Sequence, residues 1–171
     1  MATLPAIRKR HMGMMLKTLD TLGHVLKNTT QEQATTLRDG PEGWTILEVV
    51  CHLRDFDGFF RQRAEMMLNQ DVPDLPAYDH EALAIERAYN EQNLAYVYDE
   101  LVTSRRATFK FFRQLSDDDW QRTGNHPERE SFSMTDAVMQ VGLHDIDHLE
   151  QITRILEQEV PGSGSLPSER L

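Results

Sequence analysis

The feature that most constrains this chain is a helical repeat of apolar residues that covers most of its length. Apolar side chains recur at spacings of mostly three and four in four segments: Ile7 to Lys27, Thr45 to about Gln70, Leu94 to Leu115 and Ser133 to Glu157. This spacing places them on one face of an α-helix. No alternation long enough to build a sheet is present. The pattern predicts an all-α four-helix bundle, with a core made from the inward faces.

Two of the predicted helices have clear starting points. Thr45 is followed three residues later by Glu48, which is the spacing of a capping box, so the second helix should begin at Thr45. Ser133 can accept hydrogen bonds from first-turn amides, and Asp136 lies near the positive end of the last helix. The last helix should therefore begin just after Ser133.

The segments between the helices predict how the helices are connected. Segments 28–43 and 116–131 are polar and carry glycine and proline, so they predict loops, the second with room for a short turn or ribbon. Segment 69–79 contains two prolines and predicts an irregular crossover. A single helix over 80–115 would be about 54 Å long, too long for a compact domain of this size. We therefore expect a break near 89–93.

Length and charge limit the class of protein. The chain has 171 residues, which suits one domain, and we expect that domain to cover 1–158, with a flexible C-terminal tail at 159–171. Its 18 Lys+Arg and 28 Asp+Glu give a net charge of −10. Such a surface repels phosphate backbones, and no basic patch offsets it, so we expect no nucleic-acid partner.

The expected compartment is a reducing cytoplasm. Cys51 is the single cysteine, which rules out an intrachain disulfide and a cysteine-rich zinc module. The first residues lack the arrangement of a signal peptide. No uninterrupted apolar run approaches the length of about 18 residues that a membrane span needs. We expect no membrane contact.

Three histidines form the candidate metal site. His144 and His148 are four residues apart in the last predicted helix, so both imidazoles project from one face. A protein-bound divalent metal usually takes three or more ligands. His52 lies beside the core stripe of the second helix and is the best third ligand, whereas His11 is better explained as a residue at the edge of the core. The alternative is three separate histidines, each with its own partner.

A zincin-like protease helix is disfavoured. In that motif two histidines flank a glutamate that acts as general base. Here Asp145 stands in place of the glutamate, and no third ligand follows at a suggestive spacing. We assign no general base and no catalytic residue from the sequence.

Several motifs together resemble the DinB/YfiT-like superfamily of metal-binding bundles. The resemblance covers about 7–156. The motifs are Trp44-Thr45 before Glu48, Cys51-His52-Leu53, Trp120-x-x-x-Gly124-x-His126-Pro127 and His144-x-x-x-His148-Leu149-x-Gln151-Ile152.

The resemblance implies a bundle in which the second and third helices run the same way, joined by a long crossover at Asn69 to about Asn90. It also implies that His52, His144 and His148 hold nickel, zinc or another divalent ion, with water completing the coordination shell.

The resemblance also implies a range of activities. Family members include thiol transferases that use bacillithiol, the mycothiol-dependent maleylpyruvate isomerase and proteins described as metal-dependent hydrolases. For this chain it implies a bacterial metal-dependent enzyme that activates a thiol or water, of the thiol S-transferase or hydrolase type, acting on a small-molecule substrate. A low-molecular-weight thiol is a candidate cofactor, although no residue marks a pocket for a particular one. One alternative is a non-catalytic metal-binding or stress-response interaction protein, and another is a scaffold whose apolar helix faces form a homodimer.

Four polar residues near the histidines are candidates for orienting the metal ligands. Asp55 follows His52 in the second helix, Asp145 and Asp147 lie beside the other two histidines, and Gln151 follows on the ligand face. For each carboxylate, the alternative is a solvated helix face.

Two further features have simpler interpretations. Arg105-Arg106 is interpreted as a solvated helix face, with an anion site as the alternative. Cys51 projects about 100° away from His52 on a helix, so we expect a buried structural thiol and not a nucleophile.

Overall fold

The computed structural model describes residues 3–158, so the predicted tail at 159–171 lies outside the described residues. Four long helices form the molecule: α1 (Leu4–Leu26), α3 (Ile46–Asn69), α5 (Leu94–Arg113) and α6 (Met134–Glu157). The shorter elements are α2 (Gln31–Thr36), α4 (His80–Glu86), β1 (Thr123–His126), β2 (Arg129–Ser133) and 3-10 turns at Tyr89–Glu91 and Asp119–Gln121. The predicted four-helix bundle is confirmed.

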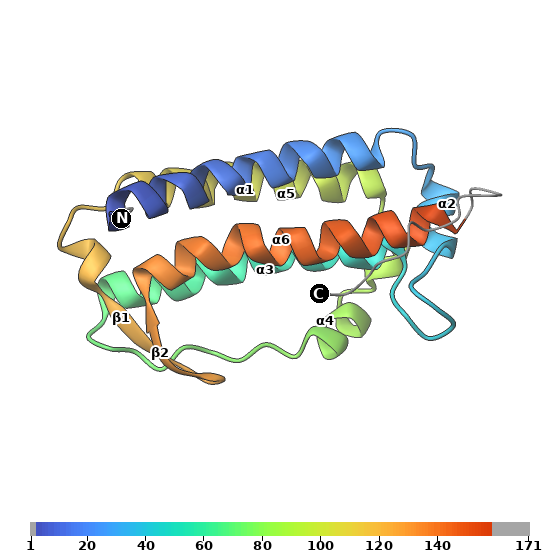
Figure 1. Cartoon of the computed structure of the whole chain (residues 1–171). Helices are drawn as coiled ribbons and strands as arrows, with labels where there is room; N and C mark the ends of the chain where they lie inside the picture. The colour runs from blue at the N-terminus through green and yellow to red at the C-terminus, as the bar shows by residue number, and fades with distance from the viewer. Residues whose placement is uncertain (1–2, 159–171) are drawn as a thin grey trace, which may run out of the picture.

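The long helices pack in a ring of four. Helix α1 packs against α5 and α6, and α3 packs against the same two helices. Helices α1 and α6 run in one direction, and α3 and α5 run in the opposite direction (Figure 1). The second and third long helices are therefore parallel, as predicted. The crossover between them returns along the outside of the bundle, at the bottom of Figure 1.

Capping boxes fix where the two site-bearing helices begin. The backbone N–H of Glu48 donates to the Thr45 hydroxyl (3.2 Å), and the backbone N–H of Thr45 donates to the Glu48 carboxylate (2.7 Å). Ser133 and Asp136 form the same pair of bonds at the start of α6. Both predicted helix starts are confirmed. Each cap contributes about 1 kcal/mol and sets which residues of its helix face inward.

The core consists of two apolar clusters. One joins the end of α1 to the start of α3 and α5 and includes Leu22, Val50 and Leu101. The other, toward the opposite end of the bundle, includes Phe60 and Phe112. Both follow the periodic positions in the sequence.

A layer of buried polar groups lies between the two clusters, and it overturns one expectation. Arg105 is 1 % exposed, so a solvated face is wrong for it, although Arg106 is exposed. The Arg105 guanidinium donates to Asp57 and Asp145 and to the Met15 carbonyl oxygen. The hydroxyls that donate to the two carboxylates belong to Thr18, Ser104 and Thr108. We call Arg105, Asp57 and Asp145 with these hydroxyls the arginine network.

The connections differ from the predictions in one place. Helix α2 forms inside predicted loop 28–43, where Thr30 and Gln33 make a capping box. Strands β1 and β2 form an antiparallel hairpin, which is the short ribbon for which the predicted loop 116–131 left room. The predicted break near 89–93 is confirmed by the turn between α4 and α5. No helix in the described part of the chain is long and apolar enough to cross a membrane.

The hairpin is held by the crossover. The backbone N–H of Asn125 donates to the Pro73 carbonyl oxygen and the backbone N–H of Leu75 donates to the Asn125 carbonyl oxygen, both at 2.9 Å. A Cβ on Gly124 would lie 3.1 Å from atoms of Leu75, Met67 and Pro73, so a larger residue would push the two segments apart. This contact places the hairpin beside the α3 face that carries His52.

Candidate metal centre

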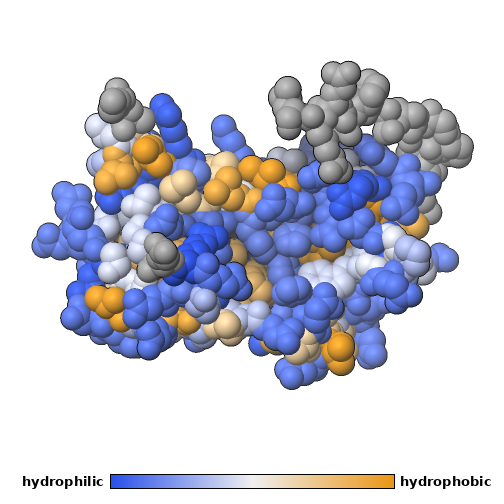
Figure 2. Space-filling view, turned by 60° about the horizontal axis from the view of Figure 1, so that its bottom comes forward, coloured by the Kyte–Doolittle hydropathy of each residue, from blue (hydrophilic) through white to orange (hydrophobic). Residues whose placement is uncertain are grey.

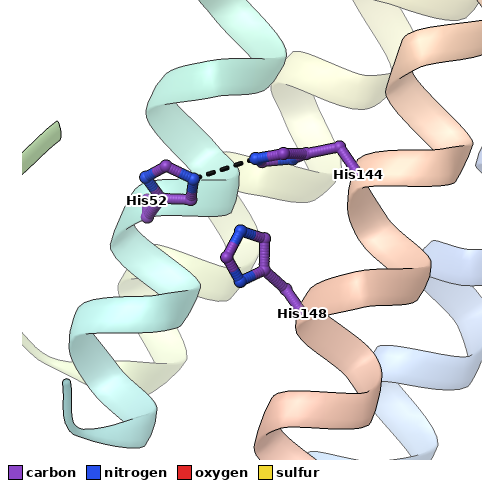
Figure 3. A group of neighbouring side chains, drawn as sticks. All are labelled: His52, His144 and His148. Carbon is purple, nitrogen blue, oxygen red and sulfur yellow. Dashed lines mark hydrogen bonds between the residues drawn. The ribbon is translucent and has the colours of Figure 1, made fainter. Parts of the chain in front are cut away.

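Three histidines from two helices meet in the bundle. His52 comes from α3 and His144 and His148 come from α6, and the three rings turn toward one another (Figure 3). The Nε2 atoms of His52 and His144 are 2.9 Å apart. One ring nitrogen from each histidine lies within 4.8 Å of the others. The structure thus brings together the three residues that the sequence singled out, whereas His11 lies outside this group.

The three imidazoles are held in their neutral form. Burial, with a smaller contribution from the neighbouring histidines, lowers the pKa of His52 to about 2. The same two causes lower the pKa of His144 to about 3. Burial also lowers the pKa of His148. A neutral imidazole keeps one nitrogen lone pair, which is the form that binds a metal.

The hydrogen bonds of the cluster leave nitrogen atoms without suitable partners. The Nδ1 of His148 lies 2.8 Å from Gln151 Oε1, an acceptor, so Nδ1 carries the proton and Nε2 keeps its lone pair. The Nδ1 of His52 is buried and has no hydrogen-bond partner among the described residues. An unmade bond of this kind costs about 1–3 kcal/mol.

These donor atoms suit a divalent metal. Imidazole nitrogens bind zinc at about 2.0–2.1 Å, so two nitrogens that share an ion can be up to about 4.2 Å apart. The distance of 2.9 Å between the Nε2 atoms of His52 and His144 falls inside this limit. The three ligand atoms lie within 4.8 Å of one another, so a small rotation of a ring is enough to bring them all within this limit. Sharing an ion would let both facing Nε2 atoms act as lone-pair donors.

The cluster opens into a pocket of about 560 Å³ between α3, α6, the crossover and the hairpin. Figure 2 turns the crossover side forward and shows a mostly hydrophilic face with small, separate hydrophobic patches. Aromatic rings line the pocket next to His52: the Phe56 ring centroid is 4.1 Å from that of His52, and the Trp44 centroid is 5.0 Å away. His80 lies further out, with its centroid 6.1 Å from that of His52.

Sequence reasoning did not assign most of the pocket residues to a site. Phe56 and Phe60 follow His52 at spacings of four on one helix face, so their position was available in the pattern. The same spacing also fits residues of the apolar core. No local signal places the crossover and hairpin residues in the pocket, because their position depends on tertiary contacts. These pocket residues are Tyr78, His80, Glu81, His126 and Glu128.

Asp55 and Asp145 do not occupy the positions expected for them. Both are buried, so a solvated face is wrong for each. Asp55 accepts hydrogen bonds from Arg54, Arg87 and the Tyr89 hydroxyl. Asp145 belongs to the arginine network. Neither carboxylate has a hydrogen bond to an imidazole among the described contacts, and each is paired with an arginine.

Asp147 and Gln151 each match an interpretation made from the sequence. Asp147 is exposed, which matches a solvated helix face. Gln151 contacts the cluster, since its Oε1 accepts from His148 and its Nε2 donates to Asp39 at 3.2 Å. Gln151 therefore fixes which nitrogen of His148 carries the proton.

Cys51 is buried, as predicted, and stands apart from the site. Its Sγ is 3.6 Å from the Tyr89 carbonyl oxygen, and burial raises the pKa of its thiol to about 12. The thiol stays protonated near neutral pH, so it is a packing group and not a nucleophile.

Comparison with known proteins agrees with this geometry. The family model of the DinB superfamily matches residues 14–152. A protein of Oceanobacillus iheyensis named "Putative metal-dependent hydrolase" is 28 % identical over 149 residues, which is 82 % of this chain and 83 % of that protein.

Two solved structures share the fold. YfiT from Bacillus subtilis, described as "a probable metal-dependent hydrolase with an unusual four-helix bundle topology", superposes with a TM-score of 0.79 at 22 % identity, over 88 % of this chain and 86 % of YfiT. The mycothiol-dependent maleylpyruvate isomerase gives a TM-score of 0.72 at 14 % identity, over 89 % of this chain and 63 % of the isomerase. Since the family match spans most of the sequence, the chain belongs to the DinB superfamily.

Proposed function

We propose that this protein is a metal-dependent enzyme in which His52, His144 and His148 hold a divalent ion that activates water. One observation carries the proposal: three neutral imidazoles converge at an open pocket of about 560 Å³. The name of the Oceanobacillus relative supports the hydrolase type. We propose nickel or zinc as the ion, since both are among the metals that imidazole nitrogen suits.

The chain's residues have distinct roles in this proposal. A bound divalent ion supplies Lewis acidity, which eases loss of a proton from a water or thiol bound to it. His52, His144 and His148 would hold the ion, and a site with three protein ligands would have room for a water or substrate ligand. Gln151 holds the Nδ1 proton of His148 and so keeps its Nε2 lone pair free. Phe56 and Trp44 place aromatic rings beside His52, where they can contact an apolar part of a substrate.

His80 lies at the solvent side of the pocket. It starts α4 in the crossover, and its side chain is 57 % exposed. Its ring centroid is 5.7 Å from that of Trp44, at the outer side of the pocket. We assign it a hydrogen-bonding role toward the outer part of a bound substrate, since its ring nitrogens can donate or accept a hydrogen bond.

Thiol transfer is the second candidate. It uses the same metal and the same open position, with a thiol in place of water. The likeness to an isomerase described as mycothiol-dependent motivates this candidate. The open pocket beside the histidines favours both candidates over a purely structural metal site, because a ligand can reach the cluster.

The test is turnover by the metal-loaded full chain. Ester and amide substrates report hydrolysis, and low-molecular-weight thiols with an electrophile report transfer. We expect activity that disappears with a chelator and returns with nickel or zinc. His148→Ala should lose it, and His24→Ala, at an exposed position, should keep it. If no assay shows metal-dependent turnover, the protein is not an enzyme of either proposed type.

A further inference from the structure

The pocket has a second polar end, and its central residue is Arg63. This arginine lies on α3, eleven positions after His52, which is about 16 Å further along the helix axis. Its side chain is 5 % exposed and lines the same pocket as the three histidines. His126 from the hairpin lies beside it, with its Nε2 atom 3.1 Å from Arg63 Nη1.

Arg63 is a buried charge with no ion-pair partner among the described residues, and the Glu128 carboxylate acts on it only from beyond ion-pair distance. Its Nε and Nη2 atoms donate to the Pro76 carbonyl oxygen at 3.1 and 2.6 Å, and the third contact is the one to neutral His126. No carboxylate among the described side chains lies within ion-pair distance of it. A guanidinium has five N–H donors, so one N–H on each terminal nitrogen is left over.

This arrangement is unusual for a buried arginine. A buried charge is normally paired, because an unpaired charge in a low-dielectric site is destabilising. Arg105 in the same bundle shows the usual solution, with a carboxylate on each side. Arg63 has no such carboxylate in the described part of the chain, and its side chain lines a pocket that a small molecule can enter.

A continuous strip of aromatic rings joins the two polar ends. Phe56 is next to His52, and the Phe60 ring centroid is 5.1 Å from that of His144. Tyr78 continues the strip, because its centroid is 6.2 Å from that of Phe56 and the Arg63 guanidinium lies 5.1 Å above its ring. The pocket therefore presents imidazoles at one end, apolar rings in the middle and a guanidinium at the other end.

We propose that the Arg63 end of the pocket binds a carboxylate group of the substrate, whose apolar body lies over Phe56, Phe60 and Tyr78. The two unused N–H groups of Arg63 match the two oxygens of a carboxylate. The substrate class is an elongated carboxylic acid with its reactive bond near the histidine end. The role of the histidine end rests on the proposed function, whereas binding of the carboxylate does not.

A carboxylate suits this pocket better than a phosphate monoester. Glu42, Glu81 and Glu128 also line the pocket, and their negative charges oppose a dianion more strongly than a monoanion. Phosphate chemistry therefore serves as a separate arm of the test.

The test compares ligands that differ only at the anionic end. The probes are 5-phenylpentanoate, its neutral amide 5-phenylpentanamide, and 4-phenylbutyl phosphate, titrated calorimetrically into the full chain. Each titration is made on metal-loaded and on metal-stripped protein. Arg63→Gln removes the charge, Arg63→Lys keeps a charge with fewer donors, and Arg61→Gln removes a charge from the same helix outside this pocket.

We expect the wild-type chain to bind the carboxylate roughly tenfold or more tightly than the amide, as a charge-assisted hydrogen bond implies. Arg63→Gln should reduce this preference to about twofold or less, Arg63→Lys should keep part of it, and Arg61→Gln should keep all of it. Circular dichroism controls for folding, since Arg63 also holds the crossover.

Equal binding of carboxylate and amide by the wild-type chain would overturn the proposal, and so would no binding of any probe. That comparison needs no variant to fold. Tighter binding of the phosphate would replace the carboxylate with a phosphate group. If the carboxylate preference is present but no metal binds, the proposed function fails and the anion site stands.

Discussion

Two groups of polar side chains lie inside this bundle, and they differ in how completely the protein satisfies them. In the arginine network, Arg105 donates to two carboxylates and a backbone carbonyl oxygen, and hydroxyl groups donate to the same carboxylates. In the histidine cluster, the Nε2 atoms of His52 and His144 face each other, and His52 Nδ1 has no described partner. The first group is complete without a ligand, and the second is not.

The difference separates structure from function. A network in which each polar group has a partner holds four helices in one arrangement, and removing a member leaves a buried charge. A cluster with unmet nitrogen atoms costs stability and is retained where a ligand completes it. Variants of the two groups should therefore have different effects. Variants of the arginine network should lose stability, whereas variants of the histidine cluster should lose ligand binding with little loss of stability.

The largest effect is expected for Arg105→Met. This change removes the cation and leaves Asp57 and Asp145 buried without their main partner, which should lower the free energy of unfolding by about 3–5 kcal/mol. Urea denaturation followed by circular dichroism measures it. Arg106→Met, at the exposed neighbouring position, should cost less than about 0.5 kcal/mol. A loss of less than about 1 kcal/mol for Arg105→Met would mean that the network is not a main support of the bundle.

The next effect is a pH dependence of the metal-free chain. His52 and His144 stay neutral in the folded state, with pKa values of about 2 and about 3, whereas histidines of the unfolded chain take up protons below about pH 6.5. Protons therefore favour the unfolded state, and stability should fall as pH drops from about 6.5 toward 3, by at most about 1.4 kcal/mol per pH unit for each histidine.

Denaturant titrations in a chelator across this pH range measure the slope. His144→Gln should flatten it relative to the wild type, because one of the buried titrating groups is gone. Equal slopes for the wild type and His144→Gln would show that the cluster is not held neutral by burial.

The smallest change in stability is expected for Gln151→Ala. Gln151 contacts His148 only through its amide, so its loss should cost less than about 1 kcal/mol of unfolding free energy. The variant should affect metal binding more than stability. Its affinity for nickel or zinc should fall roughly 10- to 100-fold, because the Nδ1 proton of His148 loses its acceptor.

A competition titration with a chromophoric chelator measures the affinity. Glu150→Ala, at the exposed neighbouring position, serves as the matched control and should bind metal as the wild type does. An unchanged affinity in Gln151→Ala would remove Gln151 from the site.

The helices and their starts could be predicted because the signals are local. Capping at Thr45 and Ser133 depends on residues three positions away, and apolar periodicity depends on one turn of helix. The hairpin could not be predicted in the same way. Its polar strand β1 is held by the crossover through Pro73 and Leu75, a contact between segments about fifty residues apart in sequence.

The arginine network shows a signal that was present and misinterpreted. Arg105 lies four residues after Leu101, Asp57 four after Leu53 and Asp145 four after Val141, so all three occupy core-facing positions. Charged residues are usually exposed, and that general tendency outweighed the spacing. One arginine and two aspartates at core-facing positions of three helices indicate a buried ion-pair network. Arg63 was missed for the same reason, and its pocket depends on the fold of the crossover.

The most direct test of the account is the metal content of the full chain purified without a polyhistidine tag. After exposure to nickel or zinc and removal of excess ion, elemental analysis should find about one divalent ion per wild-type chain. His148→Ala should hold close to none, at nearly unchanged metal-free stability, and His24→Ala should match the wild type. Absence of stoichiometric metal in the wild-type chain would contradict the central claim that the histidine cluster is a metal site.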